Sequence, residues 1–275
     1  MSYDPVVLTR LSTFMQRIAD HVRLGYCFWT SGEINADKAP AFVRKFDRLY
    51  AVGRTRHQRA WARLKGEAGA VLLLYAPTAH TPPTTGKDEP TKVAQLPTSS
   101  APKQTTATEP PTADTPCPIT LLWVLLVTPG EHLAHRFEVL RDANTEIGRI
   151  QVRDFELVRL PRPGQASAAW TWRLTTAAYQ GWRANLIDVA RRQPARLPSE
   201  VQRLGKTPGF AGCRTQVKKL LQLAKAEHQR RMPGNAVLTV PRVWYVQRLA
   251  SGTLRLSQLR RNSNRHTLNS TTGVG

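Results

Sequence analysis

The stretch that decides the fold is His21-Val22-Arg23-Leu24-Gly25-Tyr26-Cys27-Phe28-Trp29-Thr30-Ser31-Gly32-Glu33, where a basic entrance leads into a run of aromatic residues and a glycine. Aromatic residues favour extended structure, so this stretch predicts a strand. Its aromatic side chains could fill a core or stack on nucleobases, and the residues alone leave both open. The continuous apolar runs at 70–76 and 119–127 favour a core role for Phe28 and Tyr26.

Helices and further strands surround this first strand. Apolar residues at three- and four-residue spacing predict one helix from about Val7 to His21 and another over residues 39–50. A short basic helix follows at 54–65. Apolar runs then predict buried strands at Ala70–Ala76 and Ile119–Thr128.

After residue 130 the sequence predicts first a mixture of helix and strands and then a mostly helical part. Residues 131–140 suit a helix, residues 149–159 a strand, and residues 170–174 its hairpin partner. From Ser199 onward the pattern is mostly helical and basic, with a last extended segment at Val237–Val246. This order predicts an α+β fold: an RRM/ferredoxin-like domain over residues 1–160 and a basic, largely helical part over residues 161–256.

Two segments lack any core-forming pattern. Residues 78–117 are rich in Thr, Pro, Ala and Ser, and they predict a disordered insertion between two strands. Its three lysines are outnumbered by four acidic residues, so the positive charge of the chain belongs to the folded part. Residues 257–275 predict a disordered basic tail.

The charge balance points to a polyanionic partner. Basic residues outnumber acidic ones 40 to 19, which gives a net charge of +21, and nucleic acid is the default partner of such a surface. No apolar run reaches the roughly 20 residues that span a bilayer. No secretory signal is recognisable, so we expect a cytoplasmic protein without a membrane partner.

The sequence predicts neither a metal nor a cofactor. The three cysteines are widely separated, and the His132/His135 pair has no third ligand nearby. The common phosphate-binding and hydrolase motifs are absent, as is a paired acidic cluster for magnesium. If the protein cuts nucleic acid, it would do so without metal, and RNA permits that because its own 2′-hydroxyl can attack the neighbouring phosphate.

Three short features carry a resemblance to a known family: His21-Val-Arg23-Leu-Gly-Tyr26 with Lys38, Pro241-Arg242-Val-Trp-Tyr245, and the Gly-Phe-Ala-Gly motif that opens a basic helix. With the basic α+β layout, they resemble the crRNA-processing endoribonucleases of type IV CRISPR-Cas systems. That resemblance implies an RRM-like fold and metal-independent cleavage of the CRISPR repeat beside a stem-loop. It also implies retention of the 3′ hairpin product and assembly with other type IV effector subunits.

Carried onto this chain, the resemblance implies a cationic site of Arg23, Lys38 and Arg242, with His21 as the nearest candidate acid or base. Arginine stays protonated, so Arg23 and Arg242 would align the phosphate and stabilise transition-state charge. Each of the three cations also has a purely structural explanation. Arg23 could be a cation favoured at a helix C-terminus, Lys38 a solvated residue at a helix start, and Arg242 a charged residue on an edge strand.

The basic helices supply the expected RNA contacts, which are Arg54, Arg56, Arg59, Arg63, Arg214, Lys218, Lys219, Lys225, Arg230 and Arg231. The alternative function is a non-catalytic RNA- or DNA-binding protein, either a plasmid regulator or a ribonucleoprotein scaffold, that uses the same helices.

Overall fold

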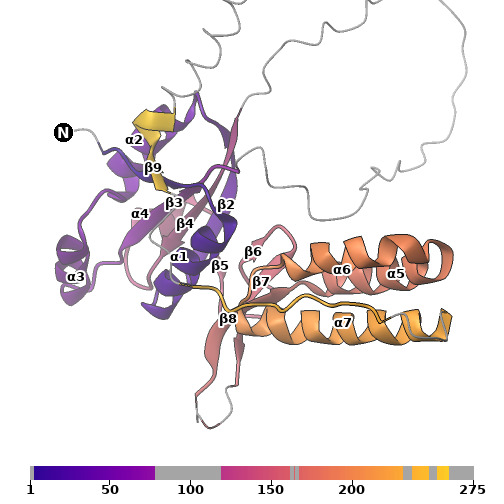
Figure 1. Cartoon of the computed structure of the whole chain (residues 1–275). Coiled ribbons are helices and arrows are strands. Elements are labelled where there is room, and N and C mark those ends of the chain that lie inside the picture. Colours follow the sequence, from indigo (N-terminus) through magenta and orange to yellow (C-terminus); the bar gives the residue numbers. More distant parts are fainter. Residues whose placement is uncertain are drawn as a thin grey trace, which may run out of the picture.

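The computed structural model describes residues 3–77, 119–161, 164, 167–231, 237–247 and 253–259 (Figure 1). The insertion predicted at 78–117 and residues 260–275 of the predicted tail lie outside these residues. The first three residues of that tail, 257–259, are helical rather than disordered, because Leu259 is buried against the main body. Within the described residues the fold is mixed α+β, as the sequence predicted.

A mixed six-stranded sheet forms the main body, with strand order β5-β2-β4-β3-β1-β9. Neighbouring strands are antiparallel except β1 and β3, which are parallel. The elements of this body are β1 (Val6–Leu8), α1 (Leu11–Arg23), β2 (Phe28–Asn35), α2 (Ala39–Tyr50), α3 (Arg56–Leu64), β3 (Ala70–Tyr75), β4 (Thr120–Val127), α4 (Leu133–Phe137), β5 (Arg141–Asp142) and β9 (Thr253–Arg255).

Of the opening stretch, residues 21–23 end α1 and residues 28–33 belong to β2, whose side chains divide between the two faces of the sheet. β2 pairs with β4 along its whole length, from Phe28 opposite Val127 to Asn35 opposite Thr120. Trp29 is buried on the face covered by α1, whereas Phe28 packs on the face covered by α2. Both faces of the sheet are therefore covered, and the aromatic residues of β2 serve the core.

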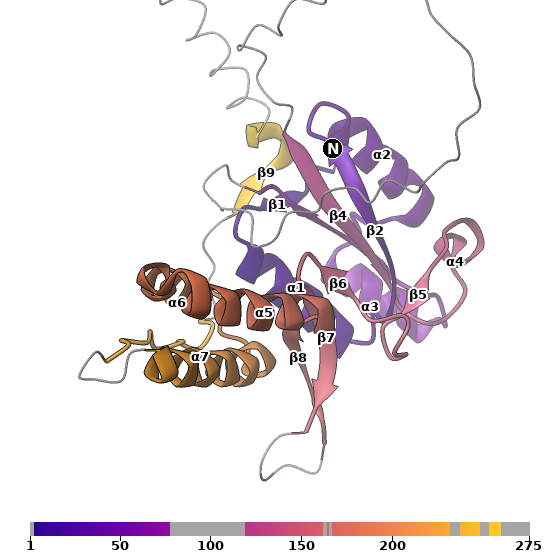
Figure 2. The ribbon, with the colours of Figure 1, turned by 90° about the vertical axis from the view of Figure 1, so that its right-hand side faces the viewer.

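A second module packs beside α1. Its three-stranded antiparallel sheet has the order β6-β7-β8, and Figures 1 and 2 show its helices projecting away from the main sheet. The indole nitrogen of Trp172 donates to the carbonyl oxygen of Met15 at 2.9 Å, so the two modules share one core. Its elements are β6 (Gln151–Val152), β7 (Phe155–Leu160), β8 (Ala169–Leu174), α5 (Thr176–Arg192), a 3₁₀ turn (Pro194–Arg196), α6 (Leu197–Gly205) and α7 (Ala211–Arg231).

Several predicted bounds were wrong. The helix predicted from Val7 begins at Leu11 instead, because Val7 and Leu8 pair with β3 as strand β1. The strand predicted at 149–159 is divided into β6 and β7 by a turn in which Arg153 has a φ of 51°. The helix predicted at 131–140 is confined to α4. The β7–β8 hairpin crosses residue 160, where the sequence suggested a domain boundary.

Candidate nucleic-acid interface

Arg23 lies in the last turn of α1, where a cation is favoured by the helix dipole. One guanidinium nitrogen lies 3.2 Å from a carboxylate oxygen of Asp20, and the other donates to the carbonyl oxygen of Trp170 at 3.0 Å. Arg23 therefore ties α1 to β8. Its side chain is still 48% exposed, so the guanidinium keeps donors for a phosphate.

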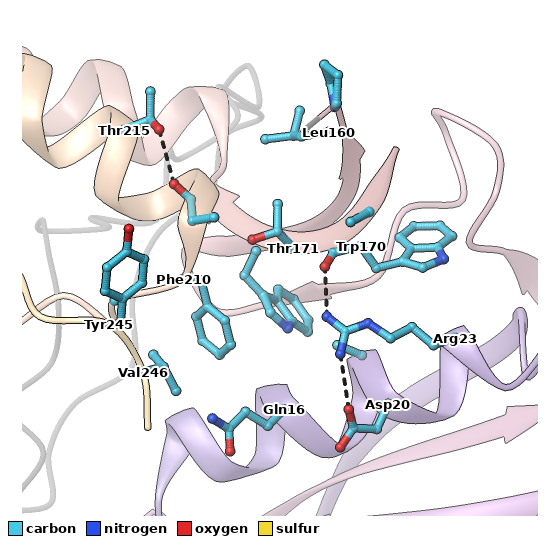
Figure 3. A pocket seen from close by; sticks show the side chains of 16 residues that line it. Gln16, Asp20, Arg23, Leu160, Trp170, Thr171, Phe210, Thr215, Tyr245 and Val246 are labelled. Atoms are coloured by element: carbon cyan, nitrogen blue, oxygen red, sulfur yellow. Dashed lines mark hydrogen bonds and ion pairs between the residues drawn. The ribbon is translucent and has the colours of Figure 1, made fainter. Parts of the chain in front are cut away.

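Arg23 borders a cavity of about 440 Å³, which we call the first cavity (Figure 3). The cavity lies between α1, β8, the start of α7 and the segment 237–247. Aromatic rings and a few polar groups make up much of its lining: Gln16, Asp20, Trp170, Thr171, Trp172, Phe210, Thr215 and Tyr245.

The segment 237–247 is held against the second module by close backbone contacts. The amide of Val246 donates to the carbonyl oxygen of Gly209 at 3.2 Å. A Cβ atom on Gly209 would lie 1.7 Å from the carbonyl oxygen of Trp244, and one on Gly205 would lie 2.4 Å from the ring of Pro241. Only glycine leaves room for this approach, which gives the Gly-Phe-Ala-Gly motif a structural reason.

Residues 240–243 of the same segment line a second cavity, of about 360 Å³, with a strongly cationic lining. Arg214, Lys218 and Lys225 lie on one face of α7 because their spacings of four and seven residues correspond to one and two helical turns. Arg242 joins them from the segment 237–247. None of the described residues that line this cavity is acidic.

Two aromatic side chains next to these cations have roles that sequence reasoning missed. The guanidinium carbon of Arg214 lies 3.3 Å from the ring centre of Tyr245, and that of Arg242 lies 4.3 Å from the ring centre of Trp244. Trp244 is 68% and Tyr245 70% exposed. The available signal was the sequence Arg242-Val-Trp-Tyr245, in which two aromatic residues follow closely after an arginine, since aromatic residues beside cations suit base stacking.

The other predicted RNA-binding residues of α7 lie away from the second cavity. Lys219 is exposed but is not among the residues that line it. Arg230 pairs with the buried carboxylate of Glu227 at 2.7 Å, and Arg231 donates to the carbonyl oxygen of Arg191 at 3.0 Å. Arg231 therefore holds the C-terminal end of α7 to α5, whereas the pair of Arg230 and Glu227 lies within α7.

The predicted cations of α3 lie apart from α7, on a helix that contributes little to the core. Arg54 pairs with Glu67 at 3.3 Å and also accepts a hydrogen bond from Arg59 through its carbonyl oxygen. The guanidinium carbon of Arg63 lies 5.4 Å from the ring centre of Tyr26. Arg56 is exposed.

His21 faces away from the first cavity. It lies two residues before Arg23, and at 100° per residue the two side chains leave opposite sides of α1. Its ring makes an edge contact with Tyr26, and its Nδ1 is buried without a hydrogen-bond partner among the described residues. Burial, followed by the nearby charge of Arg59, lowers the pKa of His21 to about 4, so the imidazole is neutral at pH 7.

Lys38 lies far from the other predicted catalytic residues. It is an exposed residue at the N-terminus of α2, beyond the end of β2, whereas Arg23 precedes the start of that strand. A strand of this length separates its two ends by roughly 25 Å. The structure thus places Arg23 and Arg242 on adjacent cavities and does not bring Lys38 or His21 to either.

The described ranges contain no group of three His, Cys, Asp or Glu side chains that could hold a metal ion. None of the helices described combines the length and the apolar character needed to cross a membrane. In comparisons with known proteins, no family model, no curated protein and no solved structure matches this chain.

Proposed function

We propose that the protein is a metal-independent endoribonuclease of the kind its sequence resembles. It cleaves CRISPR repeat RNA next to a stem-loop, remains bound to the 3′ hairpin, and assembles with other type IV effector subunits in the cytoplasm. The observation that carries this proposal is the second cavity, where Arg214, Lys218, Lys225 and Arg242 gather without an acidic neighbour among the described lining.

This cationic face suits a nucleic-acid backbone. Side chains four residues apart on a helix are separated by about 6 Å along its axis, so Arg214 and Lys218 can contact successive phosphates. The exposed ring of Tyr245 beside Arg214 suits an unpaired base. Sequence-tolerant backbone contacts together with stacking are how proteins hold single-stranded flanks of RNA.

The strand order of the main sheet supports an RRM-like origin. Strands β5-β2-β4-β3 are antiparallel neighbours, and the chain visits them in the order β2, α2–α3, β3, β4, α4, β5. This is the βαββαβ connectivity of ferredoxin-like domains. The sheet face that an RRM leaves open for RNA is covered here by α1 and the second module. The proposed RNA site therefore lies on the second module instead of on this face.

The chemistry proposed for this site uses the RNA's own nucleophile. The 2′-oxygen bonds to the phosphorus and its hydroxyl proton goes to solvent water. The bond from phosphorus to the 5′-oxygen breaks and the leaving oxygen takes a proton from solvent, so the products are a 2′,3′-cyclic phosphate and a 5′-hydroxyl. Arg23 would hold the phosphate in line and stabilise the added charge. His21 lies on the far side of α1, so general-base catalysis by His21 does not enter this scheme.

Cleavage of a cognate repeat RNA tests the proposal directly. The wild-type protein should cut in excess EDTA, and a 2′-deoxy substitution at the scissile nucleotide should abolish the product. Arg23→Ala should slow single-turnover cleavage by roughly 100-fold or more, in the range for loss of one charge-stabilising group, while affinity falls much less. Cleavage that requires magnesium would contradict the proposal.

Arg17→Ala provides the matched control. Arg17 lies on the same helix and also approaches Asp20, at 3.7 Å, but it does not line the first cavity. Its removal should leave the cleavage rate near that of the wild type. Thermal unfolding of both variants separates a catalytic loss from a loss of the contact between α1 and β8.

A non-catalytic RNA- or DNA-binding role is the second candidate. It is favoured by the separation of Arg23, Lys38 and Arg242, which share no cavity among the described residues. Such a protein would bind the same RNA with salt-dependent affinity and yield no product with or without metal.

A further inference from the structure

We propose that the first cavity holds one unstacked base of the bound RNA, and that this base stacks on the ring of Tyr245. The proposal rests on the RNA binding argued above and names a base-binding site within it. Its starting point is that Tyr245 lines the first cavity while its cation partner Arg214 lines the second.

The ring of Tyr245 therefore connects the first cavity with a cation of the second. The guanidinium of Arg214 covers one side at 3.3 Å from the ring centre. Tyr245 is nevertheless 70% exposed and belongs to the lining of the first cavity, so it keeps surface for a ligand. A cation on one side of an aromatic ring and a base on the other is a recurring arrangement in single-strand recognition.

The rest of the first cavity suits a base rather than a second phosphate. Its lining includes Trp172, Phe210 and Val246, which are apolar or aromatic, and Figure 3 shows Phe210 and Val246 beside Tyr245. Its volume of about 440 Å³ falls within the roughly 300–1,000 Å³ of small-ligand sites. Thr215, at the rim, donates its hydroxyl to the carbonyl oxygen of Ala211 at 3.1 Å and keeps lone pairs to accept a base N–H.

The cations around the cavity give the RNA a path. Arg23 and Tyr245 lie on opposite sides of the first cavity (Figure 3). Arg214 contacts the ring of Tyr245, and Arg242 lines the second cavity together with Arg214. Phosphates on the two sides of the inserted nucleotide would contact Arg23 and the second cavity in turn. In this arrangement one nucleotide of the RNA crosses the segment 237–247, and this crossing gives Arg23 and Arg242 separate phosphates to bind.

Trp244 supplies a matched control because it is adjacent and equally exposed. It contacts Arg242 at 4.3 Å from its ring centre, yet it is not among the described lining of either cavity. If exposed aromatic residues contributed to RNA affinity in general, replacing Trp244 or Tyr245 would have the same effect. A base site in the first cavity requires Tyr245 alone.

The test uses the full chain and a fluorescein-labelled RNA hairpin with single-stranded flanks, together with a series in which one flank nucleotide at a time lacks its base. The flanks carry 2′-deoxy nucleotides so that no cleavage occurs. Anisotropy should reveal one position where loss of the base weakens wild-type binding by roughly 5- to 100-fold, the effect expected of one stacked base.

Tyr245→Ala should weaken binding of the intact RNA by a similar factor and abolish the sensitivity at that position. Tyr245→Phe, which keeps the ring, should behave like the wild type, and Trp244→Ala should retain the position-specific sensitivity. Circular dichroism checks that both alanine variants fold, as expected for exposed side chains.

Three results would each overturn the inference alone. The wild type could bind RNA without any base-sensitive position, Tyr245→Ala could leave the sensitivity intact, or Trp244→Ala could abolish it as fully as Tyr245→Ala does. A wild-type protein that fails to bind the RNA at low salt would instead overturn the proposed function, and the base site with it.

Discussion

The helices α3 and α7 carry similar basic runs but are built into the molecule in opposite ways. α7 buries an apolar stripe that includes Val217, Leu220 and Ala224. α3 buries Ala62 alone among its residues and leaves Trp61 64% and Leu64 81% exposed. Figure 1 shows α3 at the edge of the body and α7 packed under α5 and α6.

The difference lies in how firmly the charged side chains are positioned. The backbone of α7 is fixed by its packing, so its cations meet Arg242 at a defined cavity. Short isolated helices are marginal in water, and α3 depends for its start on a capping box between Thr55 and Gln58. We therefore expect α7 to dominate RNA affinity, while α3 adds long-range attraction.

The largest expected effect comes from the glycine that positions the segment 237–247 against α7. Gly209→Ala would force a Cβ atom toward the carbonyl oxygen of Trp244, and we expect it to lower the free energy of unfolding by about 3 kcal/mol, at the upper end of overpacking effects. Urea denaturation measures this loss, and limited proteolysis should show the segment 237–247 released.

Gly181→Ala is the matched control. Gly181 lies within α5, and a Cβ atom there would meet nothing within 4 Å. This variant should gain up to about 1 kcal/mol from helix propensity. Equal behaviour of the two variants would contradict the tight approach of segment 237–247 to Gly209.

A smaller effect should separate the two helices as RNA-binding surfaces. Replacing both Lys218 and Lys225 with alanine removes two phosphate contacts, which should weaken RNA binding by roughly 30-fold at 0.1 M salt and reduce the salt slope by about 1.5. Replacing Arg56 and Arg63 on α3 should cost less than about threefold. Anisotropy titrations across a salt series measure the affinity and the salt slope of both double variants. Similar slopes for the two variants would contradict a dominant role of α7 in RNA binding.

The sequence predicted the main sheet well where apolar runs are continuous. The strand predicted at Ile119–Thr128 is observed as β4, and the one at Ala70–Ala76 as β3. A strand that is buried on both faces is a continuous apolar run, which the sequence shows directly. Val7 and Leu8 were mistaken for the start of a helix. A short apolar pair fits either periodicity, and their partner β3 lies more than sixty residues away in the chain.

The candidate site was less predictable because its parts depend on packing between distant elements. Basic residues on one face of α7 follow from helical spacing. Their meeting with Arg242 depends on Gly205 and Gly209, which admit the segment 237–247. The distance between Arg23 and Lys38 depends on β2 running as one straight strand between them.

The smallest expected effect concerns the attachment of α3. His21 contacts Tyr26, which stacks on Arg63 of α3, and burial followed by the charge of Arg59 lowers the pKa of His21 from 6.5 to about 4. On α1, Asp20 opposes this shift and Arg17 adds to it. The unfolded chain binds the proton more readily, so the free energy of unfolding should fall as the pH drops from about 6.5 toward 4.

Between pH 7 and 5.5 this loss should reach about 1 kcal/mol. Urea denaturation of the wild type and of His21→Gln at both pH values isolates it, because the remaining carboxylates titrate alike in both proteins. The protection factors of the α3 amides, which are corrected for the slower intrinsic exchange at low pH, should fall between pH 7 and 5.5 more in the wild type than in the variant. If both proteins lose the same stability on acidification, His21 does not titrate between the body and α3, and the weak attachment of α3 has another cause.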